Sequence, residues 1–223
     1  CTVTSNADKQ SKKDIKKARN LNPEATIIVV GCYAQLHPEK IAAIEGVDLI
    51  PGNYGKFDIL ECLKKYQKNE TPQTHASEPE DLVKYHPSYS LDDRTRSFLK
   101  VQEGCDYGCS YCTIPLARGK SRNQSIKSLI EEAQTIANSG IKEIILTGIN
   151  IGDFGRSTGE TFPELIKRLE NVSGIERYRI ASIEPNLLDD DIIHFVSQSK
   201  KFLPHFHIPL QSGCNEILTK KKR

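Results

Sequence analysis

Strand and helix patterns alternate regularly in the second half of the chain, and this alternation limits the possible folds more than any other feature. Four expected strands, at 98–102, 143–147, 177–181 and 206–210, start roughly 30 to 45 residues apart. Expected helices at 126–139, 162–169 and 190–197 separate them, and another begins near Asn215. Such alternation favours a parallel sheet. We therefore expect an α/β fold in which residues 95–223 form part of a βα (TIM-type) barrel.

A smaller α/β domain is expected over residues 1–66. The β-branched run at 26–30 predicts a buried parallel strand, and a short strand follows at 47–50. Helical patterns cover 11–20, 38–44 and 57–66. Residues 67–94 hold three prolines among mostly polar residues, which predicts a linker or an irregular crossover.

Composition narrows the functional classes. Among the 223 residues no apolar run approaches the ~18 of a membrane span, so we expect a cytoplasmic protein without a membrane partner. The net charge of +2 is too small to indicate nucleic-acid binding by itself. Seven cysteines, an odd number in a chain of this length, argue against a disulfide framework and favour metal ligation.

Three cysteines form the most informative motif. Cys105, Cys109 and Cys112 give the spacing Cys-x3-Cys-x2-Cys directly after an expected strand. Three thiolates can hold three irons of a cubane cluster and leave the fourth iron open to a substrate. A structural zinc site requires a fourth ligand, which this loop lacks, and the spacing differs from both ferredoxin patterns.

Polar residues at the ends of the later strands are further site candidates, because the reactive face of a βα barrel lies where its strands end. The second strand is followed by a glycine and an amide, the third by a hydroxyl and a carboxylate, and the fourth by an amide and a hydroxyl. These candidates are Gly148, Asn150, Ser182, Glu184, Gln211 and Ser212.

The motif Cys-x3-Cys-x-aromatic-Cys after a first strand resembles the signature of the radical S-adenosylmethionine (SAM) superfamily. This resemblance implies a [4Fe-4S] cluster whose open iron binds the amino and carboxylate groups of SAM. One electron then breaks the S–C5′ bond and releases a 5′-deoxyadenosyl radical. Tyr111 occupies the aromatic position expected near the adenine, and the strand-end residues would surround the cofactor.

A narrower resemblance covers nearly the whole chain. Residues 113–122 are similar to the stretch that follows the cluster in methylthiotransferases, and residues 1–4 and 31–35 look like that family's amino-terminal domain. That domain holds a second [4Fe-4S] cluster with three cysteines, of which Cys1 and Cys32 match two. The third would lie upstream, and the family's carboxyl-terminal RNA-binding domain is not matched, so we expect both ends to be incomplete.

The substrate prediction also rests on resemblance. Residues 147–155 and 182–185 resemble the branch that adds a methylthio group to C2 of N6-threonylcarbamoyladenosine beside the tRNA anticodon. That branch implies tRNA and a flavodoxin- or ferredoxin-like electron donor as partners. The alternatives are the branches that modify isopentenyladenosine in tRNA or a ribosomal protein. A rival of another class is a non-catalytic iron–sulfur or zinc module that binds nucleic acid.

Two arginines follow the cysteine loop. Arg118 and Arg122 are candidates for contact with the cofactor carboxylate or with an RNA phosphate. An ordinary solvated surface is the competing interpretation.

Overall fold

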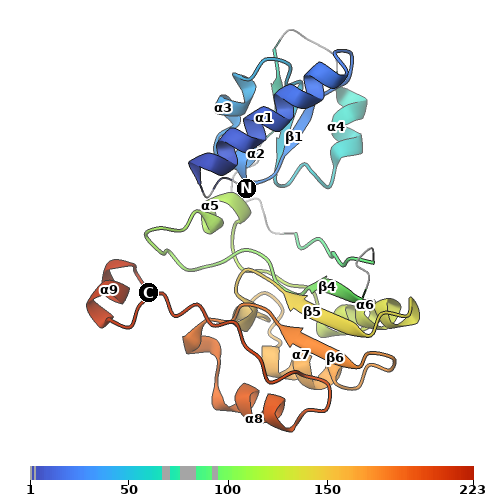
Figure 1. Ribbon diagram of the computed structural model, residues 1–223, viewed down its shortest axis with the longest axis vertical. Helices are drawn as coiled ribbons and strands as arrows, with labels where there is room; N and C mark the ends of the chain where they lie inside the picture. Colours follow the sequence, from blue (N-terminus) through green and yellow to red (C-terminus); the bar gives the residue numbers. More distant parts are fainter. Residues whose placement is uncertain (1, 3, 67–70, 76–83, 92–94) are drawn as a thin grey trace. The chain divides into compact units, whose positions relative to one another are not determined.

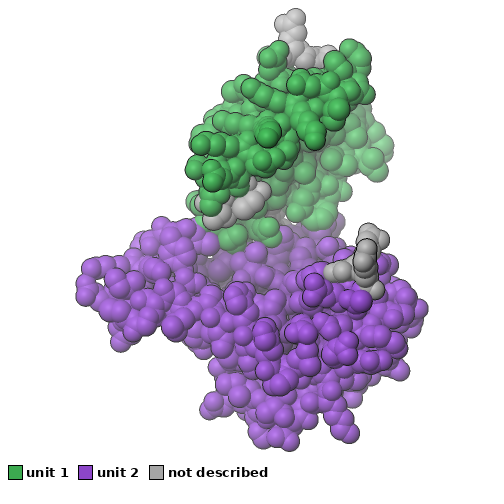
Figure 2. Space-filling view, viewed as in Figure 1, with its two compact units in different colours: residues 1–82, 113–119 green, residues 83–112, 120–223 purple. Residues whose placement is uncertain are grey.

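The computed structural model describes residues 2, 4–66, 71–75, 84–91 and 95–223. The chain divides into two compact units, which Figure 1 shows as ribbons and Figure 2 in two colours. Unit 1 comprises residues 1–82 and 113–119, and unit 2 comprises residues 83–112 and 120–223. The segment that directly follows the third loop cysteine therefore packs with the amino-terminal unit.

Unit 1 is built on a parallel sheet. Its strands lie in the order β1 (Ile28–Val30), β2 (Leu49–Gly52) and β3 (Gln73–Thr74). The helices of this unit are α1 (Ser5–Leu21), α2 (Cys32–Leu36), α3 (Pro38–Ala42), α4 (Ile59–Lys65) and α5 (Ile114–Arg118). Its core gathers Ile15, Tyr33, Ala34, Ile41, Ile44, Val47 and Ile50.

A register shift in the β1–β2 pair brings two strand ends together. Ile28 pairs with Leu49, but Val30 pairs with Gly52, so β2 has one residue more than β1 between these pairs. Pro51 lies in that stretch and has no N–H to donate, which suits an irregular position in a ladder. The shift places Gly52 opposite the end of β1, immediately before Asn53.

Unit 2 is a second parallel sheet with helices. Its strands β4 (Arg96–Lys100), β5 (Glu143–Thr147) and β6 (Arg177–Ile180) lie side by side in chain order. The helices are α6 (Ile126–Asn138), α7 (Phe162–Leu169), α8 (Asp190–Gln198) and α9 (Asn215–Lys220), with short 3-10 turns at Ile151–Asp153 and Pro185–Leu187. The parallel α/β architecture expected from the sequence is confirmed.

The core of unit 2 lies between the sheet and its helices. Strand residues Leu99, Ile144 and Leu146 are fully buried, as are Leu129 of α6 and Leu165 of α7. Burial of each such side chain contributes about 1.5–3 kcal/mol relative to exposure. This core holds the strands in register, and with them the loops at their carboxyl ends.

The expected fourth strand at 206–210 was wrong. In the described part of the chain this region makes only isolated bridges, between Tyr178 and Phe202 and between Ser182 and His207. Pro204 lies just before it and Pro209 lies within it, and neither can donate a backbone N–H to a ladder. The segment still follows β6 closely, because the Leu203 N–H donates to the Tyr178 carbonyl.

The segment expected to be a linker, 67–94, takes part in both sheets where the structure describes it. β3 pairs with β2 at one end. At the other end, Tyr89 forms an antiparallel bridge with Leu99, and the Lys100 N–H donates to the Ser88 carbonyl at 3.0 Å. In the described residues, no helix has the length and apolar character needed to cross a membrane.

Candidate functional site

The three loop cysteines follow β4 directly. Cys105 and Cys109 are buried and Cys112 is half-buried. Gly104 adopts a φ of +76°, a left-handed conformation that glycine accepts readily, and so turns the chain into the loop. The Cys112 N–H donates to the Cys109 carbonyl at 3.1 Å, which closes the loop on itself.

The thiols lie close enough to affect one another. The pKa of the Cys105 thiol is raised, chiefly because the thiol is buried. A hydrogen bond from the Tyr107 backbone lowers this pKa, but the negative charges of Asp153, Cys112 and Cys109 raise it further. Repulsion of this kind between neighbouring anionic groups is relieved when a cation binds, because iron takes thiolates and releases their protons.

The donor set suits a cluster better than a single ion. Among the residues that the structure describes, no three Cys, His, Asp or Glu side chains converge as the ligands of one metal ion do. A cubane cluster puts each thiolate on a different iron, so its ligands need not converge on one point. Three cysteines in one tight loop, without a fourth ligand, therefore fit an open cluster.

Gln102 organises the entrance to the cysteine loop, and sequence reasoning missed it. Its buried side chain donates to the Gly104 carbonyl at 2.8 Å and to Ser121 Oγ at 2.9 Å. Its Oε1 accepts from the N–H groups of Ile149 and Asn150 at 2.9 and 3.0 Å. One side chain thus ties the cysteine loop to the loop after β5. Its only sequence signal is its place between a strand and the motif.

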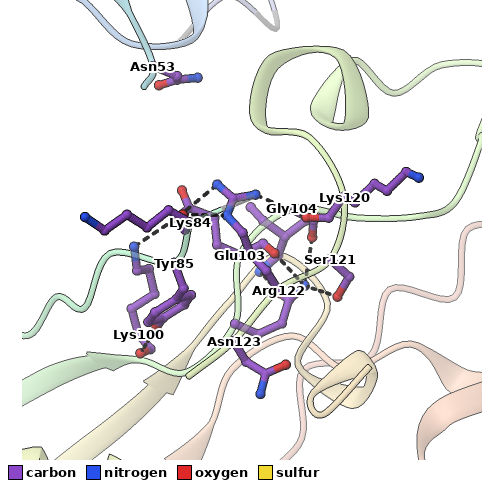
Figure 3. A network of polar contacts seen from close by, with 12 residues as sticks. Asn53, Lys84, Tyr85, Lys100, Glu103, Gly104, Lys120, Ser121, Arg122 and Asn123 are labelled. Atoms are coloured by element: carbon purple, nitrogen blue, oxygen red, sulfur yellow. Dashed lines mark hydrogen bonds and ion pairs between the residues drawn. The ribbon is translucent and has the colours of Figure 1, made fainter. Parts of the chain in front are cut away.

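A network of ion pairs and hydrogen bonds lies at the start of the same loop (Figure 3). Glu103 pairs with Lys100 at 3.0 Å and with Arg122 at 3.5 Å. The Arg122 guanidinium also donates to the carbonyls of Lys84 and Lys120, both at 3.1 Å. Arg122 is 8 % exposed. Its charge is therefore engaged inside unit 2, and its predicted contact with an anionic partner stays a prediction.

A pocket of about 310 Å³ lies beside the cysteine loop. It brings together three of the predicted cofactor contacts, Glu184, Gln211 and Ser212, with Tyr107 of the cysteine loop. Gln211 has a φ of +63°, an unusual conformation for a side chain with a Cβ, and such strain clusters at functional sites. Glu184 forms an ion pair with Arg223 at the pocket edge. The volume is at the lower end for small-molecule sites.

The other predicted cofactor contacts lie outside the lining of this pocket. Tyr111 is half exposed, with the Lys221 ammonium 5.1 Å from its ring centre. Ser182 Oγ is 2.7 Å from His207 Nδ1. Asn150 is buried and donates to Asp153 at 2.9 Å, while its Oδ1 has no hydrogen-bond partner among the described residues.

Gly148 was expected to allow a ligand to approach closely. That contact stays a prediction, and the structure shows a packing role beside it. A Cβ at this position would lie 3.0 Å from Gln102 Oε1 and 3.1 Å from Ile151 Cγ1. The missing side chain makes room for the Gln102 hydrogen bonds, so the glycine serves the packing beneath the site.

A second cysteine site lies in unit 1. Cys32 follows β1 and opens α2, while Asn53 follows β2 and places its Nδ2 at 3.7 Å from the Cys32 sulfur. The same amide donates to the Ala117 carbonyl at 2.5 Å, and the Asn53 N–H donates to Gln35 Oε1. Cys1, predicted to be a ligand of the same cluster, lies outside the described residues.

Arg118 also acts on Cys32. Burial raises the pKa of this thiol, but hydrogen bonds from Arg118 and Asn53, together with the positive charge of Arg118, outweigh it and lower the pKa overall. A thiol that ionises readily is a better metal ligand and nucleophile. The sequence placed Arg118 after the other cysteine motif; the fold brings it to this one.

Comparison with known proteins agrees with this geometry. The family model described as the radical SAM superfamily matches residues 99–223, and the model described as uncharacterized protein family UPF0004 matches residues 1–52. Threonylcarbamoyladenosine tRNA methylthiotransferase MtaB of Bacillus subtilis is 39% identical over 230 residues, covering 100% of this chain and 50% of that protein. Its counterpart in Aquifex aeolicus is 35% identical, and the match covers 98% of this chain and 54% of that protein.

A second group of relatives bears another name. The tRNA-2-methylthio-N(6)-dimethylallyladenosine synthase of Acetivibrio thermocellus is 30% identical, covering 92% of this chain and 44% of that protein. The chain spans about half the length of the curated relatives it matches. Among solved structures, the apo form of the cobalamin-dependent S-adenosylmethionine radical enzyme OxsB matches with a TM-score of 0.62 and 18% identity. The match covers 94% of this chain and 34% of the OxsB chain, and it supports the fold alone.

A parallel βα sheet whose first strand runs into a loop of three cysteines, beside a small pocket with a mostly apolar lining, is the arrangement expected of an α/β protein that holds an open metal cluster. The family match covers more than half of the sequence. The chain belongs to the radical SAM superfamily.

Proposed function

We propose that the complete protein is a radical SAM methylthiotransferase that modifies C2 of N6-threonylcarbamoyladenosine in tRNA. The observation that carries the proposal is the three-cysteine loop at the carboxyl end of β4, in a chain that aligns over its whole length with MtaB proteins. Localisation in the cytoplasm follows from a tRNA substrate, and a flavodoxin- or ferredoxin-like protein supplies the electrons.

The cysteine loop holds the first cluster. Cys105, Cys109 and Cys112 would ligate three irons of a [4Fe-4S] cluster, and the fourth would take the amino and carboxylate groups of SAM. When bound, the cluster supplies the electron that breaks the S–C5′ bond of SAM. Gln102 fixes the loop through the Gly104 carbonyl and so limits the movement of the ligands.

The pocket beside the loop suits the rest of the cofactor. The Glu184 carboxylate and the Gln211 amide line it and can hydrogen-bond an amine or ribose hydroxyls. Tyr107, Leu210 and Leu218 supply apolar surface for the uncharged parts of the ligand. This mixture of a few polar groups on an apolar lining is typical of cofactor sites.

The unit 1 site serves the sulfur-donating cluster. Cys32, together with Cys1, would be ligands of a second [4Fe-4S] cluster, and Asn53 and Arg118 would direct N–H donors at the Cys32 sulfur. Hydrogen bonds to a ligating sulfur stabilise the more reduced state of a cluster. Arg118 belongs to the segment that continues from the first cysteine loop, so a single stretch of chain carries residues of both sites.

The reaction type is tested with the complete protein reconstituted without oxygen. We expect two four-iron clusters and formation of 5′-deoxyadenosine from SAM after reduction. One zinc per chain and no cofactor cleavage would instead identify the non-catalytic module.

The substrate is tested separately. Deletion of the gene should remove the methylthio form of threonylcarbamoyladenosine from tRNA, measured by mass spectrometry of nucleosides, and leave methylthio-isopentenyladenosine unchanged. The opposite pattern would assign the protein to the branch of the Acetivibrio relative, which the 30% identity keeps as a second candidate. In either case the reaction type stands.

A further inference from the structure

Helix α1 carries a stripe of lysines that the chemistry of the two cysteine sites does not use. Lys9, Lys12, Lys13, Lys16 and Lys17 recur at three- and four-residue intervals, which places them on one face of the helix. All five are exposed, whereas Ile15 of the same helix is buried in the core of unit 1. The stripe therefore faces solvent and contributes nothing to the core.

The stripe borders a groove with a second helix. A hollow of about 1000 Å³ is lined by residues of α1, of α3 and of the turn after α3, and Lys40 of α3 adds a sixth ammonium group to its lining. The remaining lining residues are Asn20, Leu21, Ala43, Ile44 and Glu45. Six positive charges thus share one groove with a single carboxylate.

In the part of the chain that the structure describes, none of the six lysines forms an ion pair with a carboxylate. The acidic residues of α1 bond elsewhere: Asp8 accepts from Thr2 Oγ1 at 2.6 Å, and Asp14 accepts from Gln10 Nε2 at 2.7 Å. Like charges four residues apart destabilise a helix, and the pairs 9–13, 12–16 and 13–17 are all of this kind.

An uncompensated row of lysines gains most from a polyanion. From Lys9 to Lys17 the helix rises about 12 Å, which is enough to face about three to four successive phosphates of one strand. Lysine ammonium groups act as point charges without the fork geometry of arginine, which suits contact with the backbone irrespective of sequence. Among the described residues that line the groove there is no aromatic side chain on which an unpaired base could stack.

We infer that the α1–α3 groove is an RNA-docking surface that binds the phosphate backbone of a base-paired stem. The inference rests on the proposed function in taking RNA as the polyanion, and it adds where the stem of that RNA is held. An anionic membrane surface is the competing partner, and the test below separates the two.

The test neutralises part of the stripe in the complete protein. The variant Lys12→Gln/Lys13→Gln/Lys16→Gln keeps good helix-forming residues while it removes three charges. The matched control Lys64→Gln/Lys65→Gln/Lys127→Gln removes three exposed charges from α4 and α6. Binding of a fluorescent RNA stem-loop is measured by anisotropy between 50 and 200 mM salt.

We expect the stripe variant to raise the dissociation constant at least tenfold at low salt, and the control to change it less than twofold. Each phosphate contact contributes about 0.7–0.9 to the slope of log K against log salt, so the slope should fall by about 2 to 3. Formation of 5′-deoxyadenosine should be unchanged, and methylthiolation should show a higher KM for tRNA with the same kcat.

An unchanged dissociation constant and salt slope for the stripe variant would overturn the inference. If methylthiolation of tRNA persisted with an unaltered KM, the proposed function would still stand. Failure of the wild-type protein to methylthiolate tRNA would reject the proposed function, and the RNA-binding comparison would still decide on the groove. Loss of binding to phosphatidylserine vesicles, with RNA binding unaffected, would assign the stripe to a membrane surface instead.

Discussion

Replacement of Gln102 by alanine should destabilise unit 2 and loosen the cysteine loop. The side chain is 0 % exposed and makes five hydrogen-bond contacts, of which three share the two N–H bonds of Nε2 and two are accepted by Oε1. Truncation removes all five and leaves the N–H groups of Ile149 and Asn150 and the Gly104 carbonyl without these partners. Each lost bond lowers the free energy of unfolding by about 1 kcal/mol. The buried groups left unpaired add to this loss and water that reaches them reduces it, so we expect a total of about 3–5 kcal/mol.

The assay is thermal unfolding of the complete protein without metal, followed by circular dichroism. For a chain of this size each 1 kcal/mol lowers Tm by about 2–4 °C, so we expect a decrease of roughly 6–20 °C in the transition of unit 2. The matched control is Gln134→Ala on α6, where the side chain makes two exposed hydrogen bonds. That change should cost less than about 1 kcal/mol.

Metal binding provides an independent measurement. Because Gln102 holds the Glu103 and Gly104 carbonyls at the start of the cysteine loop, Gln102→Ala should also reduce the iron retained after anaerobic reconstitution. A Tm within about 2 °C of the Gln134→Ala control, which corresponds to less than about 1 kcal/mol, would refute the reasoning. The side chain would then be a passive filler of the space beside Gly148.

Three further predictions concern the sites and the stability of unit 1. Cys109→Ala should abolish 5′-deoxyadenosine formation and lower bound iron, and normal cofactor cleavage by this variant would reject the cluster assignment. Glu184→Gln should raise the KM for SAM about tenfold, since a charged hydrogen bond is worth about 1.5 kcal/mol or more; an unchanged KM would remove Glu184 from the cofactor site. Burial raises the pKa of Asp48, but hydrogen bonds from the Ile27 N–H, Tyr66 and Arg19 outweigh it and lower the pKa below its ordinary 3.8. The carboxylate therefore stabilises the fold above about pH 4 and loses this effect as the pH falls through the lowered pKa. Asp48→Asn should cost about 1–3 kcal/mol at pH 7 in chemical denaturation, with a difference that shrinks in acid, and a difference that is constant with pH would contradict the assignment.

Much of the fold was predictable because it depends on local patterns. The strand at 143–147 and the helix at 162–169 have the predicted bounds, since hydrophobic periodicity and the Thr161 cap act over a few residues. The segment at 206–210 shows the limit of such reasoning. A strand was predicted there, but Pro204 just before it and Pro209 within it cannot donate to a regular ladder.

The candidate sites, like the fold, have a part that the sequence predicts and a part that it does not. The spacing of Cys105, Cys109 and Cys112 is a property of the sequence, and it is enough to predict an open cluster, because three ligands within eight residues must lie close together. The position of Cys32 after a strand was equally apparent, although the predicted burial of that strand was wrong, because Ile28 and Val29 are half-buried and Val30 is exposed. The motif resemblance extended these local signals to a family, which the comparisons confirm at the level of the superfamily.

The tertiary structure alone decided which distant residues support these cysteines. Asn53 reaches Cys32 because a register shift between β1 and β2 aligns the ends of these two strands. Arg118 reaches Cys32 because α5 packs in unit 1, although the residues before and after this segment in the sequence belong to unit 2. Gln102 joins two loops that lie 47 residues apart in the chain. Contacts of this kind depend on how elements pack, and packing leaves no periodic trace in a single sequence. The sequence therefore determined the chemistry of the ligands, and the fold determined their surroundings.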